Sequence, residues 1–152
     1  MRTMTAFVTA GAGFLLAVLW FDLMFDVQVL RHRGAVVSEE ALAAISGYYR
    51  RVTTTARPMN WLVGAAMLAT VAAIVVQIAR GDEPRWVGWV SLALAGSAVA
   101  VATGHTFPAA VRLGARTDPV EVQGRLARSI CRDHLWCLAA ITTLLVIQLA
   151  FA

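Results

Sequence analysis

The segment MNWLVGAAMLATVAAIVVQIA, residues 59–79, decides the fold class of this chain. It contains no charged side chain, and it lies between Arg57-Pro58 and Arg80-Gly81. About 20 helical residues are needed to cross the hydrocarbon core of a bilayer. A segment of this length and composition therefore predicts a transmembrane helix.

Three further segments have the same length and apolar character, at about residues 5–25, 86–111 and 135–152. No segment alternates between polar and apolar residues as a membrane β-strand does. Since the backbone of a lipid-embedded segment must form its own hydrogen bonds, each segment is expected to be a helix. We therefore predict an all-α integral membrane four-helix bundle that forms a single domain over residues 1–152.

The composition excludes an ordinary soluble domain. Of the 152 residues, 59% are hydrophobic and 14% are charged, whereas soluble domains have roughly 45–50% and about 25%. The net charge is +4, and all 13 basic residues are arginines. Because these arginines flank the apolar segments instead of forming one patch, nucleic acid is not an expected partner.

The arginines are distributed unequally between the connecting segments. Ten of them belong to the two segments that follow the first and third spans: Arg31, Arg33, Arg50, Arg51, Arg57, Arg112, Arg116, Arg125, Arg128 and Arg132. By the positive-inside rule these two basic segments should be cytoplasmic, with a short outer loop between them and both termini outside the cytoplasm. The expected location is the inner (plasma) membrane. We assign topology or lipid-headgroup roles to Arg50, Arg51, Arg57, Arg125, Arg128 and Arg132.

Both basic segments carry signals for helix starts. Ser38 precedes two acidic residues and predicts an N-cap. Asp118 precedes Pro119, and Glu121 follows at the position of a capping box. We expect one long helix to run from Pro119 into the last span.

A ridge of small residues marks the third span, where Gly96, Ala100 and Gly104 are spaced four residues apart. Such ridges permit the close approach of helices in lipid. The ridge fits packing within the bundle and fits a dimer interface equally well.

Two acids at the end of the first span are the main candidate for a functional site. Asp22 and Asp26 are four residues apart and share one face of a helix. Acidic residues in or near a span are costly, and they usually face the bundle interior or water. One interpretation is a metal, proton or polar-substrate site, and the other is a structural ion pair with Arg57 or Arg132.

Three more polar residues are expected at the same depth, namely Asn60, His105 and His134. Two histidines and two aspartates could bind a transition metal, and two histidines could bind haem. No pair has the spacing of a known ligand motif, so the cofactor stays unknown and no metal ligand is assigned. Cys131 and Cys137 are expected to be packing residues.

The sequence resembles the anthrone-oxygenase-like group of small four-span bacterial membrane proteins. The matching features are the apolar first span, Tyr48-Tyr49-Arg50-Arg51 before Arg57-Pro58-Met59-Asn60, and residues 128–134 at the start of the last span. The resemblance implies a four-helix membrane bundle. It allows oxygen-dependent chemistry on an aromatic or lipid-like substrate.

Three functional hypotheses follow. The first is a small membrane protein whose helical bundle associates with a partner membrane protein, with lipid or with a second copy. The second is a membrane enzyme, or a metal- or haem-binding protein, with a polar pocket near the cytoplasmic leaflet. The third is a small proton-coupled transporter that uses Asp22, which ranks last because no charge is expected at the bilayer midplane.

Overall fold

The computed structural model describes residues 2–31, 37–82 and 84–152. In this part of the chain every regular element is a helix and there is no strand. Four helical segments are long and apolar enough to cross a membrane. The predicted all-α four-helix membrane bundle is therefore confirmed.

The four spanning segments contain most of the helical residues. They are α1 (Arg2–Asp26), α3 (Arg57–Arg80), the third segment made of α4 (Arg85–Val101), η2 (Ala102–Thr106) and α5 (Phe107–Ala115), and α6 (Val120–Phe151). The element η2 is a π-helical turn inside the third segment. The first span, Thr3–Leu30, also includes most of the 3-10 turn η1 (Val27–Arg31). Helix α2 (Glu39–Thr54) is not among the spanning segments.

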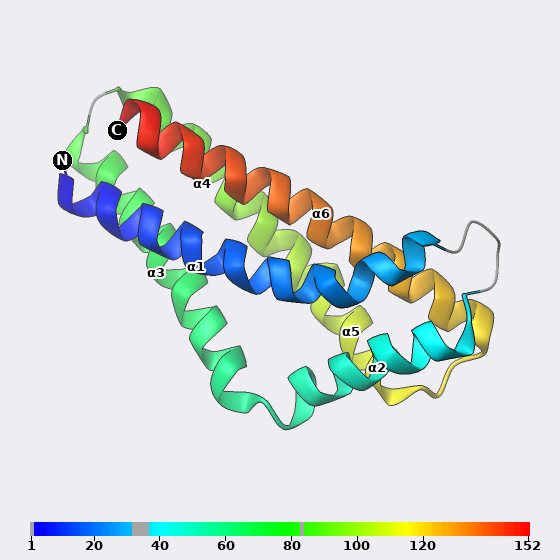
Figure 1. Cartoon of the computed structure of the whole chain (residues 1–152). Helices are drawn as coiled ribbons and strands as arrows, with labels where there is room; N and C mark the ends of the chain where they lie inside the picture. The colour runs from blue at the N-terminus through cyan, green and yellow to red at the C-terminus, as the bar shows by residue number, and fades with distance from the viewer. Residues whose placement is uncertain (1, 32–36, 83) are drawn as a thin grey trace.

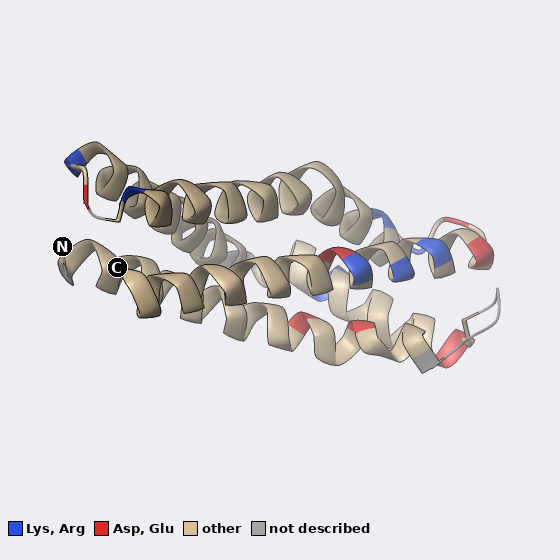
Figure 2. Ribbon diagram, turned by 90° about the horizontal axis from the view of Figure 1, so that it is seen from above, with Lys and Arg blue, Asp and Glu red and all other residues tan. Residues whose placement is uncertain are grey.

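Both chain termini lie at one end of the bundle, together with the connection between α3 and α4 (Figure 1). The opposite end is formed by α2 and by the connection between α5 and α6. Most of the basic residues gather there (Figure 2), and we call it the basic end. The two basic segments of the sequence thus lie on the same side of the bundle.

Two apolar cores hold the helices together. The core of the terminal half joins α1, α3, α4 and α6 through residues such as Val8, Ile74 and Leu144. The core of the basic end places α2 against the helices α5 and α6, with Leu42 and Leu113 fully buried. Helix α2 is therefore a packed part of the protein.

The predicted cap at Ser38 is confirmed, since its side chain accepts a hydrogen bond from the Ala41 amide at 3.3 Å. The cap predicted at Asp118 is wrong. Arg112 donates two hydrogen bonds of 2.7 Å to the Asp118 carboxylate, and Pro119 occupies the N-cap position of α6. A bidentate bond to a guanidinium is stronger than a bond to a neutral amide, so it takes the carboxylate away from the helix start.

The small ridge of the third span does not pack inside the bundle. A Cβ atom added to Gly96 or Gly104 would meet no atom within 4 Å, and α4 instead buries a neighbouring face that includes Ser91 and Ala98. The close helix approach occurs at Gly11, where an added Cβ would lie 2.1 Å from the Thr70 hydroxyl oxygen. The dimer interpretation of the ridge stays a prediction.

Two glutamines join the helices at the terminal half. Gln77 of α3 and Gln148 of α6 each donate an amide hydrogen bond of 3.1 Å to the other. Gln148 also donates to Ser91 of α4 at 3.0 Å, and it is fully buried. Hydrogen bonds of this kind between helices stabilise bundles in lipid.

Helix α3 is packed along only one half of its length. Its first buried residue is Thr70, and none of the described side chains from 58 to 69 is buried. Trp61 is 80% exposed and Leu68 is 72% exposed. The early half of α3 diverges from the bundle toward α2 (Figure 1).

Candidate functional site: an acid–histidine cluster beside an apolar pocket

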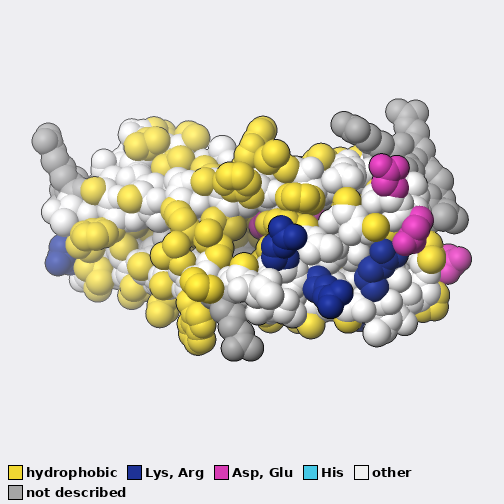
Figure 3. Space-filling view, turned by 60° about the horizontal axis from the view of Figure 1, so that its bottom comes forward, with side chains coloured by type: hydrophobic (Ala, Val, Ile, Leu, Met, Phe, Trp, Pro, Cys, Tyr) yellow, Lys and Arg dark blue, Asp and Glu magenta, His cyan; other side chains and the backbone are white. Residues whose placement is uncertain are grey.

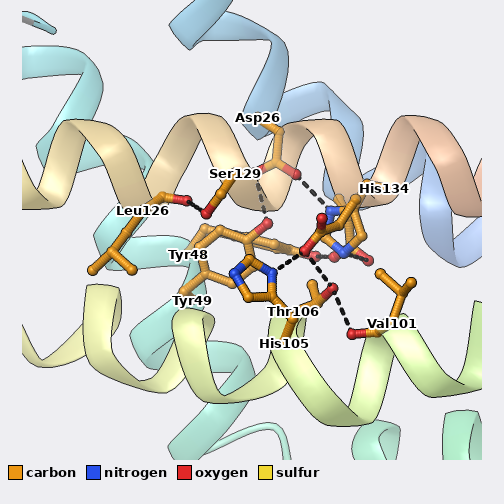
Figure 4. A network of polar contacts seen from close by, with 11 residues as sticks. Asp26, Tyr48, Tyr49, Val101, His105, Thr106, Leu126, Ser129 and His134 are labelled. Atoms are coloured by element: carbon orange, nitrogen blue, oxygen red, sulfur yellow. Dashed lines mark hydrogen bonds and ion pairs between the residues drawn. The ribbon is translucent and has the colours of Figure 1, made fainter.

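The two acids of α1 meet residues from α2 and α6 (Figure 4). Tyr48 donates a hydrogen bond of 2.6 Å to Asp22 Oδ1, and Tyr49 donates one of 2.6 Å to Asp26 Oδ1. The Nδ1 atom of His134 lies 2.6 Å from Asp26 Oδ2. These five side chains form one connected group, which we call the acid–histidine cluster.

The burial of Asp26 explains the composition of the cluster. Its side chain is 0% exposed, and a buried carboxylate is stable only when it is paired and hydrogen-bonded. Tyr49 and His134 supply the two partners, one to each oxygen. The cluster thereby attaches α2 and α6 to the end of α1.

Helix α2 presents the two tyrosines as neutral donors. Burial raises the pKa of Tyr48, and the adjacent Asp22 carboxylate raises it further. Burial and the Asp26 carboxylate raise the pKa of Tyr49 in the same way. The ring of Tyr48 also stacks on Phe25, with the ring centroids 4.2 Å apart.

The second histidine belongs to a separate pair. The Nδ1 atom of His105, in the π-helical turn, contacts Asp133 Oδ2 of α6, and Thr106 donates to the same oxygen at 3.0 Å (Figure 4). The His105 side chain is 53% exposed, while that of Asp133 is largely buried. Asp133 and His134 are adjacent on α6, so this pair lies beside the cluster.

Asn60 makes a different contact. Its Nδ2 atom donates a hydrogen bond of 2.7 Å to the backbone oxygen of Val52. This bond ties the start of α3 to the last turns of α2. Asn60 therefore fixes the angle between two helices, and it lines the same pocket as Asp22 and His134.

The structure thus assembles three of the five candidates, Asp22, Asp26 and His134, into one cluster. The partners of the two acids are tyrosine hydroxyls and an imidazole, and the expected ion pair with Arg132 is wrong. The side chain of Arg57 lies outside the described part of the chain.

Sequence reasoning missed Tyr48, Tyr49 and Asp133 as site residues. Two features of the sequence could have identified them. The tyrosines are adjacent within an amphipathic segment, and Asp133 directly precedes His134 where the last span begins.

Within residues 2–31, 37–82 and 84–152, no three His, Cys, Asp or Glu side chains are placed to hold a metal ion. His105 and His134 are instead each held by an aspartate of their own. Cys131 and Cys137 are buried free thiols, as expected.

A pocket of about 390 Å³ adjoins the cluster. Its walls are mainly aliphatic and come from α1, from the second half of α2, from α3 between Met59 and Val71, from the third segment and from α6. Along α1 the lining runs from Leu15 to Asp22, and along α6 from Ile141 to His134. The pocket is therefore apolar along its length and polar where it reaches the basic end.

The two acids differ in their access to this pocket. Asp22 lines the pocket, and 15% of its side chain is exposed. Asp26 is fully buried within the cluster and does not line the pocket. Asp26 is thus a structural anchor, and Asp22 is the carboxylate that a bound molecule could meet.

Comparison with known families gives one match. The model of the SHR3 chaperone family, described as an ER membrane protein, matches residues 1–150. Comparisons with curated proteins and with solved structures find no match. The expected inner plasma membrane location is wrong, because the matching family is one of the ER membrane. The match gives no support to the enzyme or transporter hypotheses, and it does not test the resemblance to anthrone-oxygenase-like proteins, which stays a prediction. Since the match covers nearly the whole chain, the protein belongs to the SHR3 chaperone family.

Proposed function

We propose that this protein is a chaperone-type membrane protein that binds an apolar segment of another membrane protein. The observation that carries the proposal is the unpacked half of α3, where apolar side chains from 58 to 69 have no buried member and form one wall of the pocket. The family description supports the same function.

The pocket offers an apolar helix aliphatic walls against which it can pack closely. Lipid chains are as apolar as leucine, so helices associate there through close packing. The facing walls carry Leu19 from α1, Val63 and Met67 from α3, and Val99 from α4. The flexible side chains of Met59 and Met67 can adapt to varied partners. Such walls suit a protein that accepts several client segments.

The surface of the protein agrees with a partner that lies within the membrane. Figure 3 shows apolar side chains covering the middle of the molecule, with charged side chains gathered mainly toward one end. Trp61, Leu62 and Leu68 of α3 are among the exposed large apolar residues. A client helix along this side would pack on α3 and insert side chains into the pocket.

Photocrosslinking in lipid nanodiscs tests the proposal. Benzoylphenylalanine replaces Val63 in the pocket wall or, as the control, Val75, which is exposed on the same helix outside the pocket. A labelled single-span peptide of leucine and alanine is the client. We expect crosslinks to the peptide from position 63 and not from position 75. Equal crosslinking from both positions, or crosslinks only to lipid or to a second copy of the chain, would contradict the proposal.

A further inference from the structure

We propose that the polar end of the pocket recognises a basic side chain, so that the preferred client is an apolar membrane segment carrying one lysine. This inference rests on the proposed function and specifies the class of partner. Its basis is the placement of Asp22 and His134 at one end of an otherwise aliphatic pocket.

The atoms of Asp22 and His134 leave two positions for a ligand. Asp22 Oδ1 already accepts a hydrogen bond from Tyr48, and His134 Nδ1 is bound to Asp26. The remaining atoms, Asp22 Oδ2 and His134 Nε2, are 3.8 Å apart. This distance is too long for a hydrogen bond, so each atom keeps capacity for another partner.

The tautomer of His134 decides what kind of partner fits. When Nδ1–H donates to Asp26, the neutral imidazole presents a lone pair at Nε2. Asp22 Oδ2 is also an acceptor, so the pocket offers two acceptors side by side. An ammonium group has three donors and no acceptor. It can therefore bond to Asp22 Oδ2, and to His134 Nε2 as well while the imidazole is neutral.

The charge balance of the pocket favours a cation. Among its lining residues there are an aspartate and a histidine but no arginine or lysine. The second carboxylate, Asp26, lies directly behind His134. The nearby arginines Arg50 and Arg132 are exposed and are not part of the lining. The two acids of the cluster outnumber its one histidine, and no arginine or lysine of the lining competes with a ligand for Asp22.

The shape of a lysine side chain matches this arrangement. Its four-carbon stem is apolar and its charge is at the tip. The stem can lie along the aliphatic walls near Leu19 and Val63, with the ammonium at Asp22. A lysine inside a span is costly in lipid. A segment with such a residue thus gains from a chaperone that supplies an acceptor within the membrane.

Three fluorescent single-span peptides test this inference in nanodiscs that contain the full chain. The peptides are identical except for one residue near the end that enters the polar part of the pocket, which is leucine, lysine or glutamate. We expect the lysine peptide to bind about tenfold more tightly than the leucine peptide, which corresponds to about 1.4 kcal/mol. The glutamate peptide should bind more weakly than both.

Two variants locate the effect. D22N should remove the preference for lysine, so that the lysine and leucine peptides bind this variant with similar affinity. D118N is the matched control, since it removes one acid that lies outside the pocket and is as exposed as Asp22, and it should keep the preference. The comparison of peptides on the unaltered protein does not depend on the folding of any variant.

The outcomes separate the two proposals. If the leucine and lysine peptides bind equally well, the basic-residue inference is wrong and the proposed function stands. If no peptide binds, the proposed function is wrong. If the lysine preference persists in a folded D22N protein, Asp22 is not the recognising group and the inference fails.

Discussion

The hydrogen bond from Tyr49 to Asp26 should contribute more to stability than the bond from Tyr48 to Asp22. Tyr49→Phe removes one hydroxyl group and keeps the aromatic ring in the core of the basic end. Asp26 then retains only the bond from His134. Because Asp26 is 0% exposed, no water replaces the lost donor on the Oδ1 atom.

The expected loss follows from the charge and burial of the acceptor. A hydrogen bond to a charged group contributes about 1.5–3 kcal/mol, so Y49F should lower the free energy of unfolding by an amount in this range. Tyr48→Phe removes an equally short bond, but its acceptor, Asp22, is partly exposed. Water can then replace the hydroxyl, and the expected loss is about 0.5–1.5 kcal/mol.

Unfolding in mixed micelles with increasing SDS, followed by tryptophan fluorescence, measures both variants. In a double-mutant cycle with D26N, Y49F should cost less than in the unaltered protein, because the acceptor of the hydrogen bond is then a neutral amide oxygen. A loss below about 0.5 kcal/mol in Y49F, or a larger loss in Y48F than in Y49F, would refute the reasoning from burial.

Two other predictions concern α2. The raised pKa values of Tyr48 and Tyr49 mean that the folded protein holds these phenolic protons more tightly than the unfolded chain. The contribution of these two bonds to stability should be constant below the ordinary tyrosine pKa of about 10 and fall as pH rises above it; above pH 10 the SDS midpoint should fall less steeply in Y48F/Y49F than in the unaltered protein. Gly114→Ala should destabilise by about 1–3 kcal/mol, because the new Cβ would lie 2.8 Å from the Arg50 amide nitrogen. Gly96→Ala, which meets no atom within 4 Å, is its control, and equal midpoints for the two variants would contradict the packing of α2 on α5.

Properties that depend on neighbouring residues could be predicted from the sequence. The spans were found because length and hydropathy are local, and the shared face of Asp22 and Asp26 follows from helical periodicity. Helix starts were partly predictable: Ser38 caps α2, but Asp118 does not cap α6. Arg112 is six residues away, and the helix-capping rule takes no account of a competing guanidinium.

Contacts between distant elements could not be predicted in this way. The two tyrosine partners of the acids come from α2 and the histidine partner comes from α6. No periodicity in the sequence indicates that α2 packs back against the end of α1. Gln77 and Gln148 are 71 residues apart in the sequence. Each lies near the end of a span, and nothing in the local sequence indicates that the two side chains bond to each other. The ridge at Gly96 was misleading. Its spacing shows that small residues share one face of the helix, but it does not show whether another helix packs against that face.

The acid–histidine cluster and the pocket depend on each other through α2. The tyrosines attach α2 to the acids of α1, and Asn60 attaches the start of α3 to the end of α2. Helix α3 is fixed at its other half by Gln77 and by the terminal core. Its early half is thus held at both ends, away from α1, with no buried residue between 58 and 69. The acids that anchor α2 therefore also keep the pocket open, which accounts for a buried charged cluster in a protein that otherwise consists largely of apolar helices.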